Sequence, residues 1–413
     1  MNNHTRDLLV PLISAKAPAL VGYLDYRRME LSKKQKRFDG RYALRPVIDL
    51  KQFTSRAVID WITIGVLLNR HTQFQWIQKE LESIVGRALY VENIFGDPNA
   101  SSDGFDILFQ EPEISVVLKA MDALRTKFGL ALDPIVRSIE ISVDFTPKTP
   151  NDLERARMVR LLMNHLQVNN DVISDVRDRP RTVWGRGEGE GKTNRLLYDS
   201  RHLTNDQNKR FLMETDRDRA PYTDGTLEVG KKNGQVKWRV MDKIIDRQNV
   251  AAGTFMPLDD RSKRARVEVT LDRPEVEALG ITYLNDLKAL SFTQLQGRYF
   301  QFALPTFASQ VSRKTGIGMT IAAARNPERA AKFFKTGVMG LKAMDEVSAE
   351  RWLRMRRTIL PDMHERGLLL SPIERTAKGV AGTFVAYDEL NKRVRIALRN
   401  LGRRVGADFL SGA

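Results

Sequence analysis

Residues 137–145 read Arg-Ser-Ile-Glu-Ile-Ser-Val-Asp-Phe, and this stretch decides the fold. Its apolar side chains occupy every second position, with Glu140, Ser142 and Asp144 between them. Alternation with a period of two is typical of a β-strand that has one apolar face. Because the apolar face must be buried, the stretch predicts a sheet whose opposite face carries the two carboxylates.

Two further stretches have the same character. Residues 58–66 are β-branched and aromatic, with Asp60 as the one acid in a mostly buried strand. Residues 264–271 alternate, which places Arg266 and Glu268 opposite an apolar face. An ionised carboxylate on a strand is costly to bury unless it is paired or bound to a metal. The three strands therefore single out these charged side chains as candidates for function.

Helices are expected between and after these strands. Apolar residues at helical spacing predict helices at 72–85, 113–128 and 152–166, and a hairpin is expected at 89–109. Residues 174–250 are rich in Gly, Arg, Asp and Thr, which is typical of hairpins and long loops. The predicted fold class is α+β, a central antiparallel sheet flanked by helices and followed by a basic, mostly helical C-terminal region.

The composition favours a polyanionic partner. Lys and Arg number 67 against 51 Asp and Glu, which gives a net charge of +16. Such a field attracts nucleic acid, although a soluble protein that is merely basic would show the same balance. No cysteine is present, so disulfides, thiolate zinc sites and thiol catalysis are excluded. Any metal must be held by carboxylates or by the scattered histidines.

Three regions are expected along the chain. Residues 1–45 are basic and irregular, 46–307 contain the predicted sheet, and 308–413 turn helical and basic. The final helix, expected near 387–405, carries a basic stripe made of Lys392, Arg395, Arg399 and Arg403. This last region either grips DNA or is a solvated helical subdomain. No apolar run is long enough to span a membrane and no signal-like start is visible, so the expected location is cytoplasmic.

A metal site is one interpretation of the strand acids. Glu140 and Asp144 are separated by roughly 13 Å of extended chain, too far to share one ion without a bend or a bulge. A neighbouring strand could bring Asp60 beside one of them and begin an oxygen cage for Mg²⁺ or Mn²⁺. The alternative is that these acids pair with Arg137, Arg266 or other cations, or that this face of the sheet is wet.

A candidate nucleophile follows in a hairpin at 181–200, whose second strand presents Tyr198 between basic and acidic neighbours. A tyrosine can attack a phosphodiester when the phosphate charge is stabilised by a metal, although a strand tyrosine more often only packs. A second stretch, at 226–243, echoes the first, and there Met241 precedes its Asp as Tyr198 precedes Asp199.

The order of these elements resembles the replication initiation factor family, the initiators of rolling-circle plasmids, filamentous phages and some integrative elements. The resemblance spans 58–307. Four short features carry it: Ile59-Asp60-Trp61, the strand from Ser138 to Asp144, the two hairpins that begin at Thr182 and Thr226, and Arg266-Val267-Glu268. In the family these look like a Val-Asp-Trp strand, an acidic strand, Thr-x-x-x-Gly with Arg-x-Tyr-x-Lys, and Arg-x-Glu.

The resemblance implies that residues 46–307 form a nicking and joining domain, in which a tyrosine attacks one strand at a replication origin and stays linked to the 5′ phosphate. It implies Asp60 and Glu140, with Asp144 as a weaker candidate, as ligands of Mg²⁺ or Mn²⁺. Tyr198 would be the nucleophile, and Glu268 with Arg266 would support the site. The implied DNA contacts are Arg195, Lys192, Arg239 and Lys243. Further implied partners are a host helicase, a polymerase and a second copy of the chain.

The sequence departs from the family pattern at the nucleophile. Tyr198 follows Arg195 by one residue too many, and the better-spaced hairpin has Met241 in place of a tyrosine. The nucleophile therefore stays open between Tyr198 and another tyrosine such as Tyr222. Glu140 also stands where the family often has Asp.

Two other classes of function compete with the initiator. A non-catalytic DNA-binding or regulatory protein of a phage or plasmid would bind DNA in a salt-sensitive way without cleaving it. A conjugative relaxase would also form a tyrosyl-phosphate bond, but the usual histidine cluster of relaxases is missing here.

Overall fold

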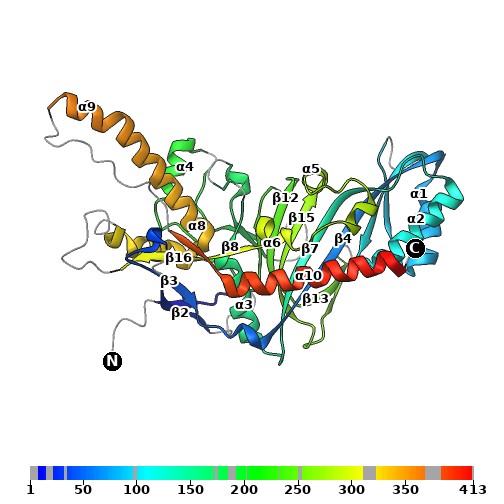
Figure 1. The fold of residues 1–413 in the computed structure, drawn as a ribbon, viewed down its shortest axis with the longest axis horizontal. Helices are drawn as coiled ribbons and strands as arrows, with labels where there is room; N and C mark the ends of the chain where they lie inside the picture. The colour runs from blue at the N-terminus through cyan, green and yellow to red at the C-terminus, as the bar shows by residue number, and fades with distance from the viewer. Residues whose placement is uncertain are drawn as a thin grey trace.

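A nine-stranded antiparallel sheet forms the centre of the molecule, which is α+β (Figure 1). The computed structural model describes residues 8–14, 22–31, 35–95, 100–169, 171–172, 175–184, 192–200, 202–231, 233–249, 254–309, 322–367 and 383–411. A six-stranded antiparallel sheet and a two-stranded ribbon accompany the large sheet. No helix in these ranges is both long enough and apolar enough to cross a membrane.

The three strands predicted at 58–66, 137–145 and 264–271 are neighbours at the centre of the large sheet. In spatial order its strands are β10 (Lys192–Arg195), β9 (Arg181–Trp184), β11 (Thr226–Val229), β12 (Val236–Lys243), β15 (Arg264–Asp272), β7 (Ile135–Pro147), β4 (Phe53–Thr72), β6 (Ser102–Gln110) and β5 (Tyr90–Asn93). The two echoing stretches form adjacent hairpins, β9–β10 and β11–β12, at one side of the sheet. Every pairing in the sheet is antiparallel, as predicted.

Helices cover the sheet where the sequence predicted them. The predicted three are α1 (Phe74–Val85), α2 (Ile114–Phe128) and α3 (Asp152–His165), and the others are α4 (Asn205–Phe211), α5 (Arg273–Glu277), α6 (Gln294–Tyr299), α8 (Asn326–Arg354), α9 (Leu360–Glu365) and α10 (Asp388–Ser411). Helix α3 packs against β7, β12 and β15, and α10 runs along β4 (Figure 1). The apolar residues of β7, such as Ile139 and Ile141, are fully buried.

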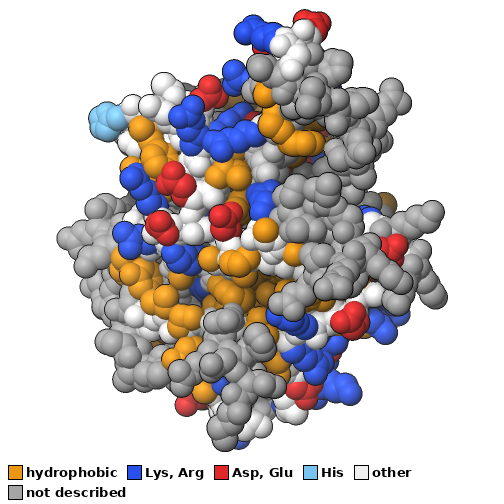
Figure 2. Space-filling view, turned by 90° about the vertical axis from the view of Figure 1, so that its left-hand side faces the viewer, with side chains coloured by type: hydrophobic (Ala, Val, Ile, Leu, Met, Phe, Trp, Pro, Cys, Tyr) orange, Lys and Arg blue, Asp and Glu red, His pale blue; other side chains and the backbone are white. Residues whose placement is uncertain are grey.

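The expectation of an irregular segment at 1–45 is wrong for the described residues there. They form β1 (Leu9–Pro11), β2 (Tyr23–Glu30) and most of β3 (Arg41–Pro46), which join β16 (Gln301–Ala308), β17 (Phe384–Ala386) and β8 (Leu166–Gln167) in the six-stranded sheet. The remaining strands, β13 (Ile245–Asn249) and β14 (Thr254–Pro257), form the ribbon. Figure 2 views the left-hand side of Figure 1, where hydrophobic side chains gather at the centre with Lys and Arg around them.

The C-terminal region does not have a core of its own. The predicted apolar stripe of α10 is buried in the same cluster of side chains as the sheet. Two arginines of α10 also bind the free side of β4, where β6 does not reach: Arg393 donates to the Phe53 carbonyl at 3.4 Å, and Arg404 donates to the Ala57 carbonyl. A helix that covers exposed strand carbonyls protects a sheet edge. The boundary expected near residue 308 therefore does not separate two cores.

Candidate functional site

Three carboxylates from the three central strands meet on one face of the sheet. Asp60 of β4, Glu140 of β7 and Glu268 of β15 each offer an oxygen, and these oxygens lie within 4.8 Å of one another. A β-bulge makes this possible, because Ile59 pairs with Ile141 and Trp61 with Glu140, leaving Asp60 as the extra residue. The prediction that a neighbouring strand brings Asp60 beside one of the two acids of β7 is confirmed.

Glu268 belongs to the acid cluster itself, whereas the resemblance implied only a supporting role for it. It pairs across the strands with Ser142, between the positions of Glu140 and Asp144 on β7. Glu268 is 2% exposed and Glu140 is 1% exposed. These two acids are therefore shielded from water, whereas Asp60 is partly exposed, and burial strengthens the electrostatic interactions of Glu140 and Glu268.

Two arginines neutralise part of this charge. Arg266 Nη1 lies 2.5 Å from Asp60 Oδ1 and 3.3 Å from Glu268 Oε1. Arg239 Nη2 lies 2.6 Å from Glu140 Oε2 and 2.7 Å from Glu268 Oε2. Arg239 was expected to contact DNA, but β12 pairs with β15 so that Arg239 stands directly opposite Glu268. Its guanidinium is therefore occupied by ion pairs with Glu140 and Glu268.

Asp144 is not a member of the cluster. Arg266 binds it with two hydrogen bonds, of 2.6 Å from Nε and 2.9 Å from Nη2, and Arg264 Nε lies 3.0 Å away. Its carboxylate is thus held by arginines. Pairing with Arg266 or other cations was the alternative to metal binding that the sequence left open for the strand acids. The separation along β7 gives the physical reason, because Asp144 stands opposite Arg266 while Glu140 stands opposite Thr270.

The charged network has one negative charge in excess when all of its carboxylates are ionised. Four carboxylates face three guanidinium groups in it: Asp60, Glu140, Asp144 and Glu268 against Arg239, Arg264 and Arg266. Burial, together with the neighbouring Glu140 carboxylate, raises the pKa of Glu268 against the lowering effect of Arg239. Glu140 Oε1 is buried and has no hydrogen-bond partner. An unpaired buried oxygen in a negatively charged group of carboxylates fits a hard divalent cation such as Mg²⁺ or Mn²⁺.

The structure does not bring Tyr198 to the acid cluster. Tyr198 follows β10 at the edge of the sheet, and three strands separate β10 from β15, which corresponds to roughly 19 Å. Its ring packs edge-on against Phe211 at 4.9 Å between centroids, under the guanidinium of Arg217 at 4.7 Å. Tyr222, the other tyrosine considered, packs on Trp184 at 4.6 Å.

The remaining predicted DNA contacts have mixed environments. Arg195 pairs with Asp199 at 2.7 Å, and Arg395 donates to Gln296 at 2.9 Å. Lys392, Arg399 and Arg403 are exposed on α10 and Lys243 is partly exposed at the end of β12, whereas the side chain of Lys192 lies outside the described part. Exposed cations on α10 remain free to meet phosphates.

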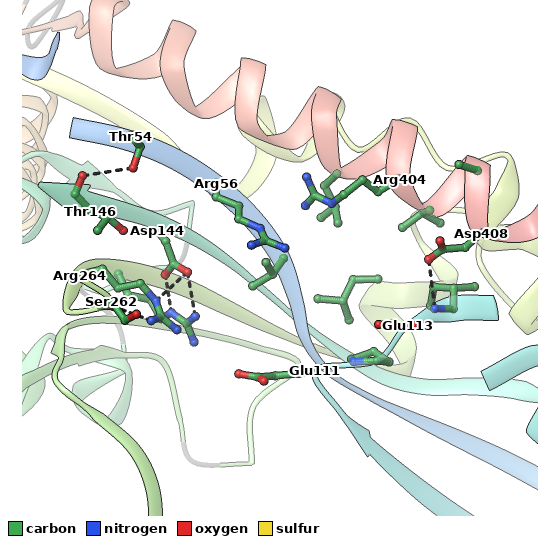
Figure 3. A pocket seen from close by; sticks show the side chains of 18 of the residues that line it. Thr54, Arg56, Glu111, Glu113, Asp144, Thr146, Ser262, Arg264, Arg404 and Asp408 are labelled. Atoms are coloured by element: carbon green, nitrogen blue, oxygen red, sulfur yellow. Dashed lines mark hydrogen bonds and ion pairs between the residues drawn. The ribbon is translucent and has the colours of Figure 1, made fainter. Parts of the chain in front are cut away.

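A cleft of about 850 Å³, missed by the sequence reasoning, adjoins the network and is lined by Arg56, Asp144, Arg266 and Arg404 among others (Figure 3). Glu111 also lines it, with φ of 41°, and no other non-glycine residue in the described ranges has a positive φ. Its amide donates to the Asp60 carbonyl at 2.6 Å. Backbone strain of this kind clusters at functional sites.

Comparison of the chain with protein-family models and with curated proteins gives no match. The resemblance to replication initiators therefore depends on the quoted residues alone. The function has to be argued from the acids, the arginines and the cleft beside them.

Proposed function

We propose that this protein binds DNA and nicks one strand in a metal-dependent hydrolysis, which leaves a 3′ hydroxyl of the kind that primes rolling-circle replication. One observation carries the proposal: three acids from three adjacent strands converge beside a cleft that is rich in arginine. Arg266 connects the two features, because it lines the cleft and also binds Asp60 and Glu268.

The chain's own residues would hold and orient the cation. Asp60, Glu140 and Glu268 offer carboxylate oxygens, the ligand type that Mg²⁺ and Mn²⁺ prefer. A bound cation would polarise the scissile phosphate and neutralise the charge that develops on it. Arg239 and Arg266 fix the positions of these carboxylates through ion pairs, as outer partners of metal ligands commonly do.

The attacking group at this site differs from the sequence-based expectation. Tyr198 lies at the far edge of the sheet, so its hydroxyl does not reach a phosphate held at the acids. We therefore assign the attack at the acid cluster to water, whose oxygen bonds to phosphorus as the P–O3′ bond breaks. One proton of the water passes to the departing 3′ oxygen and the other to solvent, so the products are a 3′ hydroxyl and a 5′ phosphate. A joining step through a tyrosyl link is not part of the proposal.

A nicking assay on supercoiled plasmid and on single-stranded DNA, with Mg²⁺ or Mn²⁺, tests the proposal together with Mn²⁺ binding measured by calorimetry. Glu140→Gln removes one ligand charge while keeping a group of similar size. We expect it to weaken Mn²⁺ binding and nicking by more than the roughly 10- to 100-fold that loss of an outer partner costs.

Glu228→Gln is the matched control. Glu228 lies on the same face of the sheet, on β11, paired with Arg181 at 2.8 Å and Lys237 at 3.2 Å, and it is not among the three clustered acids. We expect this variant to bind Mn²⁺ and to nick as the parent protein does. Equal losses in both variants would contradict a metal site at Glu140.

A second candidate, a non-catalytic DNA-binding protein, is favoured by one observation. Each of the three clustered acids already has a guanidinium within 2.7 Å, as in a purely structural network. In that case DNA binding would weaken with rising salt, and neither Mg²⁺ nor Mn²⁺ would produce a nick. The same assay therefore separates the two candidates.

A further inference from the structure

The cleft beside the acid cluster has one wall made by the C-terminal helix. Arg56 of β4 and Arg404 of α10 both line it, although they are far apart in the sequence. Their side chains point toward each other (Figure 3). Helix α10 is held in this position because Arg404 also donates to the Ala57 carbonyl and because Leu401 and Val405 are buried.

Neither guanidinium has a carboxylate partner within the described part of the chain. The cross-strand neighbour of Arg56 is Asp144, whose oxygens are already bound by Arg264 and Arg266. Burial, and then the charge of Arg56, lowers the pKa of Arg404. Asp408, one turn further along α10, offsets part of the charge of Arg404. No described residue forms an ion pair with either guanidinium, so two facing cations favour a bound anion.

The other charged groups of the cleft leave room for that anion. Glu111 and Glu113 line it from the turn between β6 and α2, and Asp408 accepts a hydrogen bond from the Ile114 amide at 3.2 Å. These acids make the part of the cleft near that turn unfavourable for a phosphate. Arg261 also lines the cleft, so an anion is favoured in the arginine-lined part of the cleft, where Arg56 and Arg404 point toward each other (Figure 3).

We propose that Arg56 and Arg404 form a phosphate-binding pair that anchors the backbone of a DNA strand beside the acid cluster. Guanidinium groups suit this role because their planar donors match phosphate oxygens. Arg56 and Asp60 are four residues apart on β4, which is at most roughly 13 Å, because the bulge at Asp60 shortens an extended strand. The pair therefore holds a neighbouring phosphate on the strand and not the one placed at the acids.

This inference rests on the proposed function for the identity of the ligand as DNA, and its test needs no cleavage. Fluorescence anisotropy of a labelled single-stranded oligonucleotide is measured in EDTA over a range of salt concentrations. We expect Arg56→Gln and Arg404→Gln each to weaken binding about tenfold, since hydrogen bonds to charged groups are strong. The slope of log affinity against log salt concentration should become less steep by about one unit in each variant, as expected for the loss of one phosphate contact.

Two variants are the controls. Arg393→Gln removes the other hydrogen bond from α10 to a β4 carbonyl without touching the cleft, and Lys79→Gln removes an exposed charge on α1, away from the cleft. We expect both to change affinity less than twofold. The proposal is wrong if Arg393→Gln loses as much oligonucleotide affinity as Arg404→Gln, or if the affinity of Arg56→Gln is unchanged.

Inorganic phosphate distinguishes a small ligand from a strand. If phosphate alone binds the parent protein tightly and not Arg56→Gln, while oligonucleotide affinity is equal in both, the site serves a free anion and the proposal fails. If both variants weaken DNA binding but the parent protein never nicks DNA with Mg²⁺ or Mn²⁺, the proposed function is wrong and the phosphate-binding pair is supported. If the parent protein nicks DNA and both variants bind it with unaltered affinity, only the phosphate-binding pair is wrong.

Discussion

Glu140 and Asp144 lie on one face of the same strand, yet their carboxylates have different partners. The residue across the sheet decides this difference, since Thr270 stands opposite Glu140 and Arg266 stands opposite Asp144. Arg266 satisfies both oxygens of Asp144, while one oxygen of Glu140 stays without a partner. Two carboxylates on one face of the same strand thus differ, because one is fully satisfied by arginines and the other keeps an oxygen without a partner.

Tyr198→Phe tests whether chemistry occurs at the acid cluster or at the edge of the sheet. The Tyr198 ring is held by Phe211 and Arg217, contacts that phenylalanine preserves. We expect the variant to nick supercoiled plasmid at the parent rate, and no protein to remain attached to the 5′ end of the cut strand. Gel mobility of the nicked DNA, with and without protease, measures both quantities.

Tyr222→Phe is the matched control for that substitution, because Tyr222 also lies in an aromatic pair outside the cluster. Loss of nicking in Tyr198→Phe alone would place a cut phosphate in the cleft of about 720 Å³ that Tyr198 lines with Arg181, Arg195, Arg217 and Arg219. A 5′ adduct on Tyr198 would then restore the tyrosine mechanism implied by the resemblance.

An alternating pattern shows on which face of a strand a residue lies, but it does not show which residues that side chain contacts. Asp60 and Glu140 could be selected because acids within β-branched strands need a partner. The sequence could not show that Arg239 is that partner for Glu140, because the pairing of β12 with β15 brings them together through space. Arg56 and Arg404 carried no local signal, since their relation depends on where α10 packs.

At the scale of elements, the end of α3 is fixed by a buried polar network. His165 Nδ1 lies 2.7 Å from the Ala303 carbonyl, so this nitrogen carries the proton. Nε2 then accepts from the Tyr26 hydroxyl at 3.1 Å, which itself accepts from Asn164 at 3.1 Å. The network joins α3, β2 and β16, and it is complete only while the imidazole is neutral.

His165 should therefore make the fold sensitive to acid. Complete burial lowers the pKa of His165 to about 4, below the 6.5 of an unfolded histidine. The unfolded chain then binds the proton first, so stability is fully present above pH 6.5 and is lost as the pH falls toward 4. Between pH 7.5 and pH 5 this residue should remove about 2 kcal/mol of the free energy of unfolding.

Urea denaturation at both pH values measures the effect. His165→Gln lacks the titrating group, so its free energy of unfolding should fall less between the two pH values than that of the parent. His71→Gln is the control, because the His71 side chain is 68% exposed and lies on the surface. The idea is wrong if all three proteins show the same pH dependence.

Elements were predictable where their signal is local. The apolar spacing of α1, α2 and α3 and the alternation of β7 and β15 follow from a few adjacent residues. Strands β2 and β3 pair with each other, and β3 is joined to the rest of its sheet by β16, from the other half of the chain, which no local pattern shows. Buried and exposed residues alternate at the start of β2, where Leu24 and Tyr26 are buried, but the many basic residues of the segment made this pattern hard to see.

At the scale of the whole molecule, α10 belongs to the sheet and not to a separate domain. Its larger buried apolar side chains are Leu390, Val394, Leu398, Leu401, Val405 and Phe409, and none is more than 6% exposed. Each contributes about 1.5–3 kcal/mol through burial, so together they rival the 5–15 kcal/mol of a typical domain. The helix also covers the free carbonyls of β4.

A chain that ends at Tyr387 should consequently fail to fold, because it would expose the apolar surface under α10 and an open edge of β4. The full chain should unfold in one calorimetric transition that includes both the sheet and α10. Within the full chain, Leu398→Ala should lower the free energy of unfolding by about 2–5 kcal/mol. Ile396→Ala, at a position that is 43% exposed, should change it by less than about 1 kcal/mol. A soluble, cooperatively folded 1–387 fragment, or two transitions in the full chain, would mean that the sheet folds without α10. The cleft wall that carries Arg404 would then not be a fixed part of the sheet's structure.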